Sequence, residues 1–507
     1  MNLATLKMLQ FNLSPMLDRR QFLFAATSAL GVSTLGDVSA LEPDLLLRAG
    51  KQNLFRVRMD VEMKGNVNIP SNPLASRKPV LKLPIESKAL FDYEERFHLA
   101  NASDPQRPDA RSNIRAAERY YHRAKADSTL NRNSHSVQLR DSVRDTIVRH
   151  DLLSDEIYGV EDFFERDELE LLRVPISSMA IDQLLPAERV RVGSRYKPSA
   201  HSLTSVLNLT AIMASDIEAE VVSLSDDDVK IQLRGTVDGS VDGVPTAIRT
   251  VGKLTFDRKS ACCTWLAIAL QETREIGRAE PGFDVAATIK MLRQPLRSTI
   301  ALPTAARKIN LLDPVPASRL YVSLTSEKLG FSVLMDRRWR MMRDQPNAAM
   351  MRMVANDRSI GQCDIRPLSQ LGDDPQRSLI AFESDVKTIL GEQLVELVES
   401  DEQVTAAGMR VLRVVANGSA EGVPVRWILM HLSDDSGKRI VATFTMEASN
   451  IDAFGGSDMQ LAGAIHFADP ATSRGSEKTS ADAASVHAAE DSSNQVADSI
   501  SNANTVR

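Results

Sequence analysis

Alternation of apolar and polar residues is the strongest pattern in the chain, and it predicts long, half-buried strands. In the segment 55–64, FRVRMDVEMK, every second residue is apolar and the residues between them are charged. Such a period of two is typical of a strand with one face on a core. A second alternation covers 81–93, and shorter ones lie near 116–126 and 136–149. These patterns favour an antiparallel sheet.

Helical spacing replaces the alternation between residues 163 and 186, where FFERDELELL has apolar residues three and four positions apart. We expect one or two short helices there, the first ending by Pro175. A further helical turn is expected after Pro198, where Leu203, Val206 and Leu207 share a face. Four strands follow, at 216–224, 229–237, 244–257 and 265–271, with the turns between them at Asp226–Asp228 and from Asp238-Gly239 to Asp242-Gly243.

The second half of the chain repeats strands around one longer helix. Strands are expected at 320–324, 331–335, 347–355 and 359–366. An apolar stripe then predicts a helix over 375–398, formed by Leu379, Phe382, Val386, Ile389 and Leu390. Strands near 408–417, 423–432, 438–447 and 462–467 complete this half.

Together these elements predict an α+β protein. A long-stranded antiparallel curled sheet with short helices would occupy residues 41–300, and a smaller α/β sandwich would occupy 318–469. The proline-containing segment 301–317, with Pro314 and Pro316, is the expected linker. Residues 470–507 contain no Phe, Tyr, Trp or Leu and are expected to form a disordered tail.

Residues 1–40 predict an export signal. Arg19 and Arg20 precede Phe22 and Leu23, residues 22–36 carry no charge, and small residues ending at Ala40 suit cleavage there. A retained membrane-spanning helix is the competing interpretation. Such a helix would need about 20 apolar residues, and this uncharged run is shorter and contains Gly, Ser and Thr. The paired arginines followed by Phe-Leu resemble the bacterial twin-arginine signal, which implies export of a folded protein to the periplasm. The general secretory route, and a start at Met16 instead of Met1, stay open.

Composition agrees with a folded protein behind this signal, since 43% of the residues are hydrophobic and 25% are charged. The net charge of −6 makes nonspecific nucleic-acid binding a poor hypothesis. The three cysteines, Cys262, Cys263 and Cys363, are too few for a disulfide framework. We expect Cys262 and Cys263 to be mostly buried, with a bridge between one of them and Cys363 left open.

No residues match a catalytic or cofactor motif, and we assign no catalytic, cofactor or metal residues. The aspartates at 226–228 and 238–242 are better explained as turn residues than as a calcium site. Six methionines and five arginines between 335 and 353 could indicate Cu(I), but core-filling methionines with arginines on the solvent face explain them better. Among the eight scattered histidines, His431 and His466 are the pair to inspect first.

Two resemblances to known folds follow from the order of elements. The run VGSRYKPSAHSLTSVLNL and the strands after it resemble the curled sheets of bacterial lipoprotein-carrier folds, which implies a hydrophobic groove. The segment GFSVLMDRRWRMM, a single long helix, and the strand containing Trp427 resemble the PsbP-like α/β sandwich, although the usual proline before the Trp is absent. That resemblance implies a protein-binding accessory role.

The leading hypothesis is therefore a non-enzymatic exported envelope protein that binds a lipid, another hydrophobic ligand or an envelope protein partner, without staying integral to the membrane. The alternative is a cofactor-free hydrolase or redox enzyme whose site is assembled from residues far apart in the sequence.

Overall fold

The computed structural model describes residues 45–47, 52–70, 80–99, 114–150, 155–369 and 377–467. The predicted export signal and the predicted tail lie outside these residues, as does most of the polar segment 100–114. The described residues up to His466 belong to one compact unit. Among the described residues, no helix has the length and apolar character that crossing a bilayer requires.

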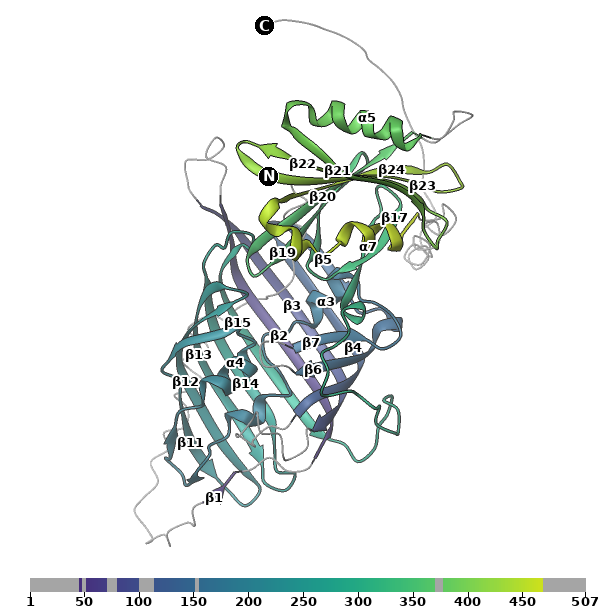
Figure 1. The fold of residues 1–507 in the computed structure, drawn as a ribbon. Coiled ribbons are helices and arrows are strands. Elements are labelled where there is room, and N and C mark those ends of the chain that lie inside the picture. The colour runs from purple at the N-terminus through teal and green to yellow at the C-terminus, as the bar shows by residue number, and fades with distance from the viewer. Residues whose placement is uncertain are drawn as a thin grey trace, which may run out of the picture. The chain divides into compact units, whose positions relative to one another are not determined.

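Antiparallel strands dominate the chain, and the largest sheet has 13 of them (Figure 1). Its main path runs β7-β6-β4-β3-β2-β15-β14-β13-β12-β11-β9, with β5 paired to β4 and β10 paired to β12. The strands are β2 (Leu54–Pro70), β3 (Val80–Leu99), β4 (Ile114–Leu130), β5 (Asn133–Gln138), β6 (Asp145–His150), β7 (Asp155–Gly159), β9 (Arg195–Tyr196), β10 (Ala211–Ser215), β11 (Glu218–Leu224), β12 (Asp228–Val241), β13 (Val244–Asp257), β14 (Cys262–Arg274) and β15 (Gly282–Pro295).

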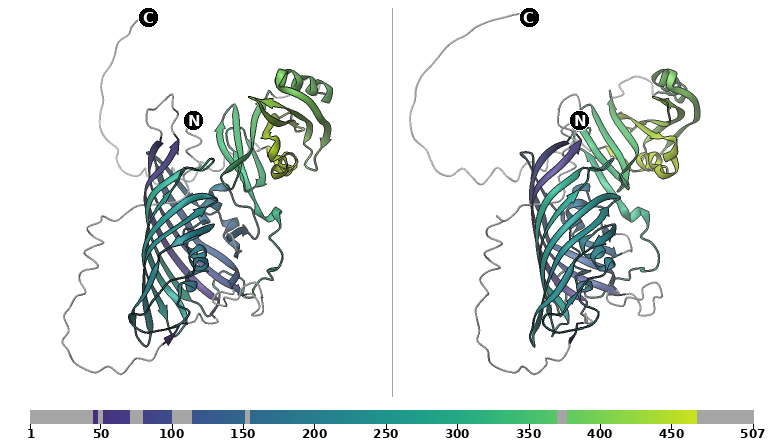
Figure 2. Two further views of the ribbon diagram at one scale, coloured as in Figure 1. Left: turned by 60° about the vertical axis from the view of Figure 1, so that its left-hand side comes forward. Right: turned by 90° about the vertical axis from the view of Figure 1, so that its left-hand side faces the viewer.

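The predicted alternation decides which face of this sheet is buried. Along β13 the even-numbered residues from Val244 to Phe256 are buried, and the odd-numbered residues from Pro245 to Lys253 are exposed. The apolar residues of β2 that the sequence singled out, from Phe55 to Met63, are likewise buried. Figure 2 shows the sheet curving around the segment that contains α3 (Arg166–Leu172) and α4 (Ala200–Leu207). We call the segment that contains α3 and α4 the crossing segment, and we call the sheet face turned toward it the inner face.

Three smaller sheets complete the structure. β1 (Leu45–Leu46) pairs with β8 (Arg189–Val190). A three-stranded sheet contains β16 (Tyr321–Ser326), β17 (Phe331–Asp336) and β25 (Ile465–Phe467). A seven-stranded sheet, ordered β18-β19-β20-β24-β23-β22-β21, contains β18 (Trp339–Gln345), β19 (Ala348–Ala355), β20 (Arg358–Leu368), β21 (Leu394–Val404), β22 (Arg410–Ala420), β23 (Val423–Ser433) and β24 (Arg439–Glu447).

One face of the seven-stranded sheet is covered by α5 (Leu379–Leu390), through Phe382, Val386 and Leu390. These three residues belong to the stripe that the sequence pattern identified. Ile389, also assigned to that stripe, is instead exposed. The other helices in the described part of the chain are α6 (Ile451–Phe454), α7 (Ser457–Ala464) and the short 3₁₀ turns η1 (Asp141–Val143), η2 (Ile181–Leu184), η3 (Ala317–Leu320), η4 (Gly391–Gln393) and η5 (Ala448–Asn450).

Several predicted boundaries are wrong. The helix expected over 375–398 ends at Leu390, because Gly391 adopts a positive φ of 50° and the chain continues into β21. Of the strand expected at 462–467, only Ile465–Phe467 is a strand, β25, because residues 462–464 belong to helix α7. Asp238-Gly239 lies within β12 and is not a turn, whereas Asp242-Gly243 forms the two-residue hairpin turn, with φ of 51° and 86°.

Candidate functional site

A cavity of about 600 Å³ lies on the inner side of the large sheet, beside the crossing segment. This volume is within the range of roughly 300–1,000 Å³ that is typical of small-molecule sites. Both the sheet and the crossing segment contribute apolar lining: Ile69, Ile157, Leu172, Leu209, Ile248 and Phe283.

Local capping interactions hold α4 at the cavity wall. Its first turn is capped by Ser199, whose Oγ accepts a hydrogen bond from the amide of Ser202 at 3.1 Å. Its last turn ends at Asn208, which has a left-handed φ of 50°. The amide of Ser177 donates to the carbonyl of Val206 at 3.1 Å, so this hydrogen bond ties the turn before η2 to α4.

Charged groups are buried beneath this wall on β3 and β4. The Arg119 guanidinium donates to Glu95 Oε1 at 2.7 Å and lies over the Tyr93 ring, 5.1 Å from its centre. Ser178, from the crossing segment, donates to the same carboxylate at 2.9 Å and accepts from the Tyr93 hydroxyl at 2.9 Å. Burial raises the pKa of Tyr93, so the hydroxyl stays protonated as a donor.

A second buried ion pair fixes η2 to the sheet. The fully buried Arg293 of β15 pairs with Asp182 of η2, and its Nε donates to the Cys263 carbonyl at 2.9 Å. The other carboxylate oxygen of Asp182 accepts the Cys263 amide at 2.7 Å. The guanidinium also lies 4.6 Å from the centre of the Phe55 ring. These contacts make η2 part of the core.

Four arginines line one region of the cavity, and we call them the arginine cluster: Arg166, Arg173, Arg337 and Arg340. Glu170 of α3 accepts hydrogen bonds from Arg166 and, at 3.3 Å, from Arg173. Burial raises the pKa of Glu170, but attraction to Arg166 and Arg173 outweighs it and lowers the pKa to about 2.

The other half of the cluster comes from the second half of the chain. Arg340 of β18 pairs with Glu280 at 2.6 Å. Arg337, between β17 and β18, donates to the carbonyls of Leu320 at 2.8 Å and Ile157 at 3.0 Å. Burial, followed by repulsion from Arg173, lowers the pKa of Arg337 to about 10.

A histidine and a carboxylate also meet at the cavity. His150, at the end of β6, contacts Asp155 Oδ1 through Nδ1 at 2.6 Å, and both residues line the cavity. The other ring nitrogen, Nε2, is buried and has no hydrogen-bond partner among the described residues. Ser177 donates to Asp155 at 3.4 Å. A carboxylate that orients an imidazole is an arrangement used in general acid–base catalysis.

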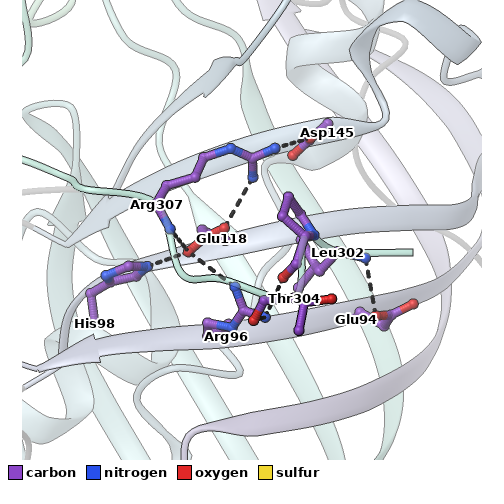
Figure 3. A network of polar contacts seen from close by, with 9 residues as sticks. Glu94, Arg96, His98, Glu118, Asp145, Leu302, Thr304 and Arg307 are labelled. Atoms are coloured by element: carbon purple, nitrogen blue, oxygen red, sulfur yellow. Dashed lines mark hydrogen bonds and ion pairs between the residues drawn. The ribbon is translucent and has the colours of Figure 1, made fainter. Parts of the chain in front are cut away.

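The outer face of β3 and β4 carries a different polar network, shown in Figure 3, which binds the segment 300–307. Glu94 accepts hydrogen bonds from the amides of Ile300 and Ala301, each at 2.8 Å. Arg96 donates to the Pro303 carbonyl at 2.6 Å. Because neighbouring residues on a strand point to opposite faces, Glu94 and Arg96 lie on the side of β3 opposite to Glu95.

Arg307 provides the second anchor of this segment. Its amide and its Nη1 each donate to Glu118 at 3.0 Å, and its Nη2 pairs with Asp145. His98 contacts the same Glu118 carboxylate at 2.7 Å, and His122 contacts Glu94 at 2.7 Å. Burial raises the pKa of both glutamates, but these hydrogen bonds outweigh it and lower both pKa values.

The residues that the sequence singled out do not form this site. Arg19, Arg20, Phe22, Leu23 and Ala40 lie outside the described residues. All three cysteines are free and buried, so the bridge to Cys363 that the sequence left open is not present.

The two histidines chosen for inspection lie in different sheets. His431, on β23, is buried, and neither ring nitrogen has a hydrogen-bond partner among the described residues. Burial, followed by repulsion from Arg439, lowers the pKa of His431 to about 4. His466, on β25, is exposed. The pair is therefore not brought together by any contact among the described residues.

The methionines and arginines of 335–353 divide between two environments. Met335, Met351 and Met353 are fully buried in core positions, whereas Met350 points to the other side of β19. Core filling therefore explains the buried methionines. The placement of the arginines on a solvent face is wrong, since all five are half-buried and Arg337 and Arg340 line the cavity.

Sequence reasoning missed both the arginine cluster and the His150–Asp155 pair. The arginine density around Trp339 was the one available signal for the cluster. No local signal indicated His150, because its environment is formed by β4, β7 and the crossing segment.

No protein-family model matches the sequence. No curated protein is detectably similar to it.

Some solved structures are similar over part of the chain. A structure from Bacteroides thetaiotaomicron is 11% identical with a TM-score of 0.21, covering 29% of this chain and 49% of its own length. Cyanobacterial PsbP from Synechocystis is 13% identical with a TM-score of 0.24, covering 31% of this chain and 99% of its own. Lipovitellin, described for lipid–protein interactions, is 10% identical with a TM-score of 0.28, covering 56% and 30%. The chain thus spans about half of the first structure. TM-scores this low support no conclusion about function.

Proposed function

We propose that the protein is an exported, non-enzymatic binding protein that holds a hydrophobic ligand on the inner side of its large sheet. The observation that carries the proposal is the cavity of about 600 Å³ with its apolar lining. Burying apolar ligand surface against such a lining contributes roughly 25 cal/mol per Å². The residues from 41 to 300 would form the ligand-binding domain, and those from 318 to 469 would form a PsbP-like sandwich that contacts a partner protein.

Filling the cavity tests this proposal. Ile248 is buried on β13 and lines the cavity, so Ile248→Trp should obstruct it. Val251→Trp is the matched control, because Val251 is a β-branched residue of the same strand that is 40% exposed on the other face. With a neutral fluorescent apolar probe, we expect Ile248→Trp to weaken binding about tenfold or more and the control to leave it unchanged.

Native mass spectrometry and solvent extraction of the protein, purified from its own compartment, provide a second test. A bound apolar molecule is expected. A protein that is empty after gentle purification and binds no probe would contradict the proposal.

The second candidate function is a cofactor-free hydrolase, and the His150–Asp155 pair favours it. Asp155 would orient the imidazole, and Nε2 would accept a proton from water as general base. Ser177 bonds to Asp155 rather than to the imidazole, so water is the expected nucleophile. The test is the hydrolysis of p-nitrophenyl alkanoates. Loss of kcat/KM of about a hundredfold or more in His150→Ala, with His466→Ala unaffected, would favour the enzyme; equal rates would exclude this site.

A further inference from the structure

The arginine cluster gathers cations from distant parts of the chain at one region of the cavity. Arg166 and Arg173 lie at the two ends of α3, which spans one edge of the cavity. Arg337 and Arg340 flank Trp339 at the start of β18. Arg166 donates to the Arg337 carbonyl, so a backbone contact joins the two pairs. The cluster therefore depends on tertiary packing.

The acidic groups around the cluster do not balance it. Across the whole cavity lining, eight arginines face seven carboxylates. Within the described residues, only two carboxylates form ion pairs with the four arginines of the cluster: Glu170 with Arg166 and Arg173, and Glu280 with Arg340.

Four guanidinium groups thus share two ion-paired carboxylates, Glu170 and Glu280. The ion pairs within the described residues therefore leave an excess of positive charge at the cluster.

Individual donors in the cluster lack a carboxylate. Arg337 makes no ion pair within the described residues, and its bonds go to two carbonyl oxygens. Arg340 uses one guanidinium nitrogen for Glu280, while its buried Nε has no partner among the described residues. The Arg352 guanidinium donates to the Gln362 side-chain oxygen at 3.3 Å and forms no ion pair within the described residues. Partly buried cations without counter-charges are costly, and an anion would offset that cost.

Apolar surface adjoins these donors. Leu172 of α3, Leu320 of η3 and Phe283 of β15 line the same cavity, and the Arg274 guanidinium lies over the Phe283 ring. A ligand that contacts the cluster can thus extend directly onto apolar walls. Guanidinium groups present planar pairs of donors that suit carboxylate and phosphate oxygens.

We propose that the arginine cluster binds the acidic headgroup, a carboxylate or a phosphate, of an amphipathic ligand whose apolar chain lies in the cavity. This inference rests on the proposed function and adds the charge of the ligand. Arg337 and Arg340 provide the contacts, since they have the unused donors. Arg166 and Arg173, which share Glu170, contribute mainly through their positive charge.

Calorimetric titration of the purified protein with three ligands of equal chain length tests the proposal. Dodecanoate and dodecyl phosphate carry the two acidic headgroups, and dodecanol is the neutral reference. At pH 8 we expect at least one acidic ligand to bind about tenfold or more tighter than dodecanol. The preference should shrink as salt is added. The stronger of the two acids identifies the headgroup as carboxylate or phosphate.

Substitution then locates the charge. Arg337→Gln with Arg340→Gln should remove most of the preference for the acid and leave dodecanol binding unchanged. Arg343→Gln is the matched control, because Arg343 is a half-buried arginine of the same strand that does not line the cavity. Arg337→Lys, which keeps the charge, should retain part of the preference.

The possible failures are distinguishable. If dodecanol binds wild-type protein as tightly as both acids do, the headgroup inference is wrong and the hydrophobic cavity stands. If the double variant keeps the full preference, the cluster is not the headgroup site. If none of the three ligands binds, the proposed function itself fails.

Discussion

Removing Asp182 should leave a buried positive charge without its counter-ion. Arg293 is fully buried, and its guanidinium is held by Asp182, by the Cys263 and Ser178 carbonyls and by the Phe55 ring. Asp182→Ala removes the only carboxylate that pairs with Arg293 among the described residues. Breaking one partner of such a buried pair costs about 3–5 kcal/mol.

A second loss adds to the first. The buried Cys263 amide donates to Asp182 at 2.7 Å, and an orphaned buried donor costs about 1–3 kcal/mol. The two penalties share the same carboxylate, so we expect a total near the upper end of the first range, about 5 kcal/mol. That is a large share of the roughly 5–15 kcal/mol by which native proteins are stable.

Urea unfolding followed by circular dichroism measures the global cost, and hydrogen exchange measures local opening of residues 178–185. Asp385→Ala is the control, since Asp385 pairs with Arg377 at the surface with about half of each side chain exposed, and its loss should cost less than about 1 kcal/mol. Arg293→Met completes a double-mutant cycle. The double variant should be more stable than the sum of the single losses predicts, by about 2–3 kcal/mol.

Two results would refute this reasoning. Equal costs for Asp182→Ala and Asp385→Ala would mean that the buried charge is relieved in some other way. Strict additivity in the cycle would mean that Asp182 and Arg293 do not stabilise one another.

Three further predictions concern other regions. The pKa values of Glu94 and Glu118 are lowered from 4.5 in the folded protein. Their contribution to stability is therefore complete above about pH 4.5 and is lost as the pH falls through the lower native values. Urea unfolding between pH 6 and 3 should show a steeper loss of stability in wild type than in Glu94→Gln/Glu118→Gln, and parallel curves would contradict this. Gly418→Ala should lower the free energy of unfolding by at least about 2 kcal/mol, because the added Cβ would lie 2.0 Å from the Gln393 carbonyl oxygen. Gly463→Ala is the control, since an added Cβ there would have nothing within 4 Å. Equal melting temperatures for the two variants would refute the clash. All three cysteines are free and buried, so mass spectrometry after alkylation should find none labelled in native protein and three labelled after denaturation, whereas a disulfide-linked peptide would show the assignment to be wrong.

The strand pattern of this protein was accessible from the sequence because burial on one face imposes a period of two. Residues 55–64 and 244–257 show that period, and both are strands in the structure. The stripe on α5 was found for the same kind of reason, at helical spacing. In contrast, the end of α5 was misplaced because Leu394 and Leu397 continue the apolar spacing, and only the positive φ of Gly391 and pairing with β22 turn that segment into a strand.

The site could not be predicted from local sequence patterns, because each segment that contributes to it has a common pattern with no functional signal of its own. FFERDELELL is a short amphipathic helix by itself, and DRRWRMM is a basic strand; neither indicates that Arg166 and Arg337 lie side by side. Their contact depends on how the connection after β15 returns the chain to α3, where Ser323 donates to the Phe164 carbonyl at 2.9 Å. The sequence by itself determined which residues are buried on one face of a strand or helix, because burial follows from side-chain chemistry and spacing. Only the tertiary structure decided which charges share a cavity, because the interaction between charges depends on distance and burial rather than on separation along the chain.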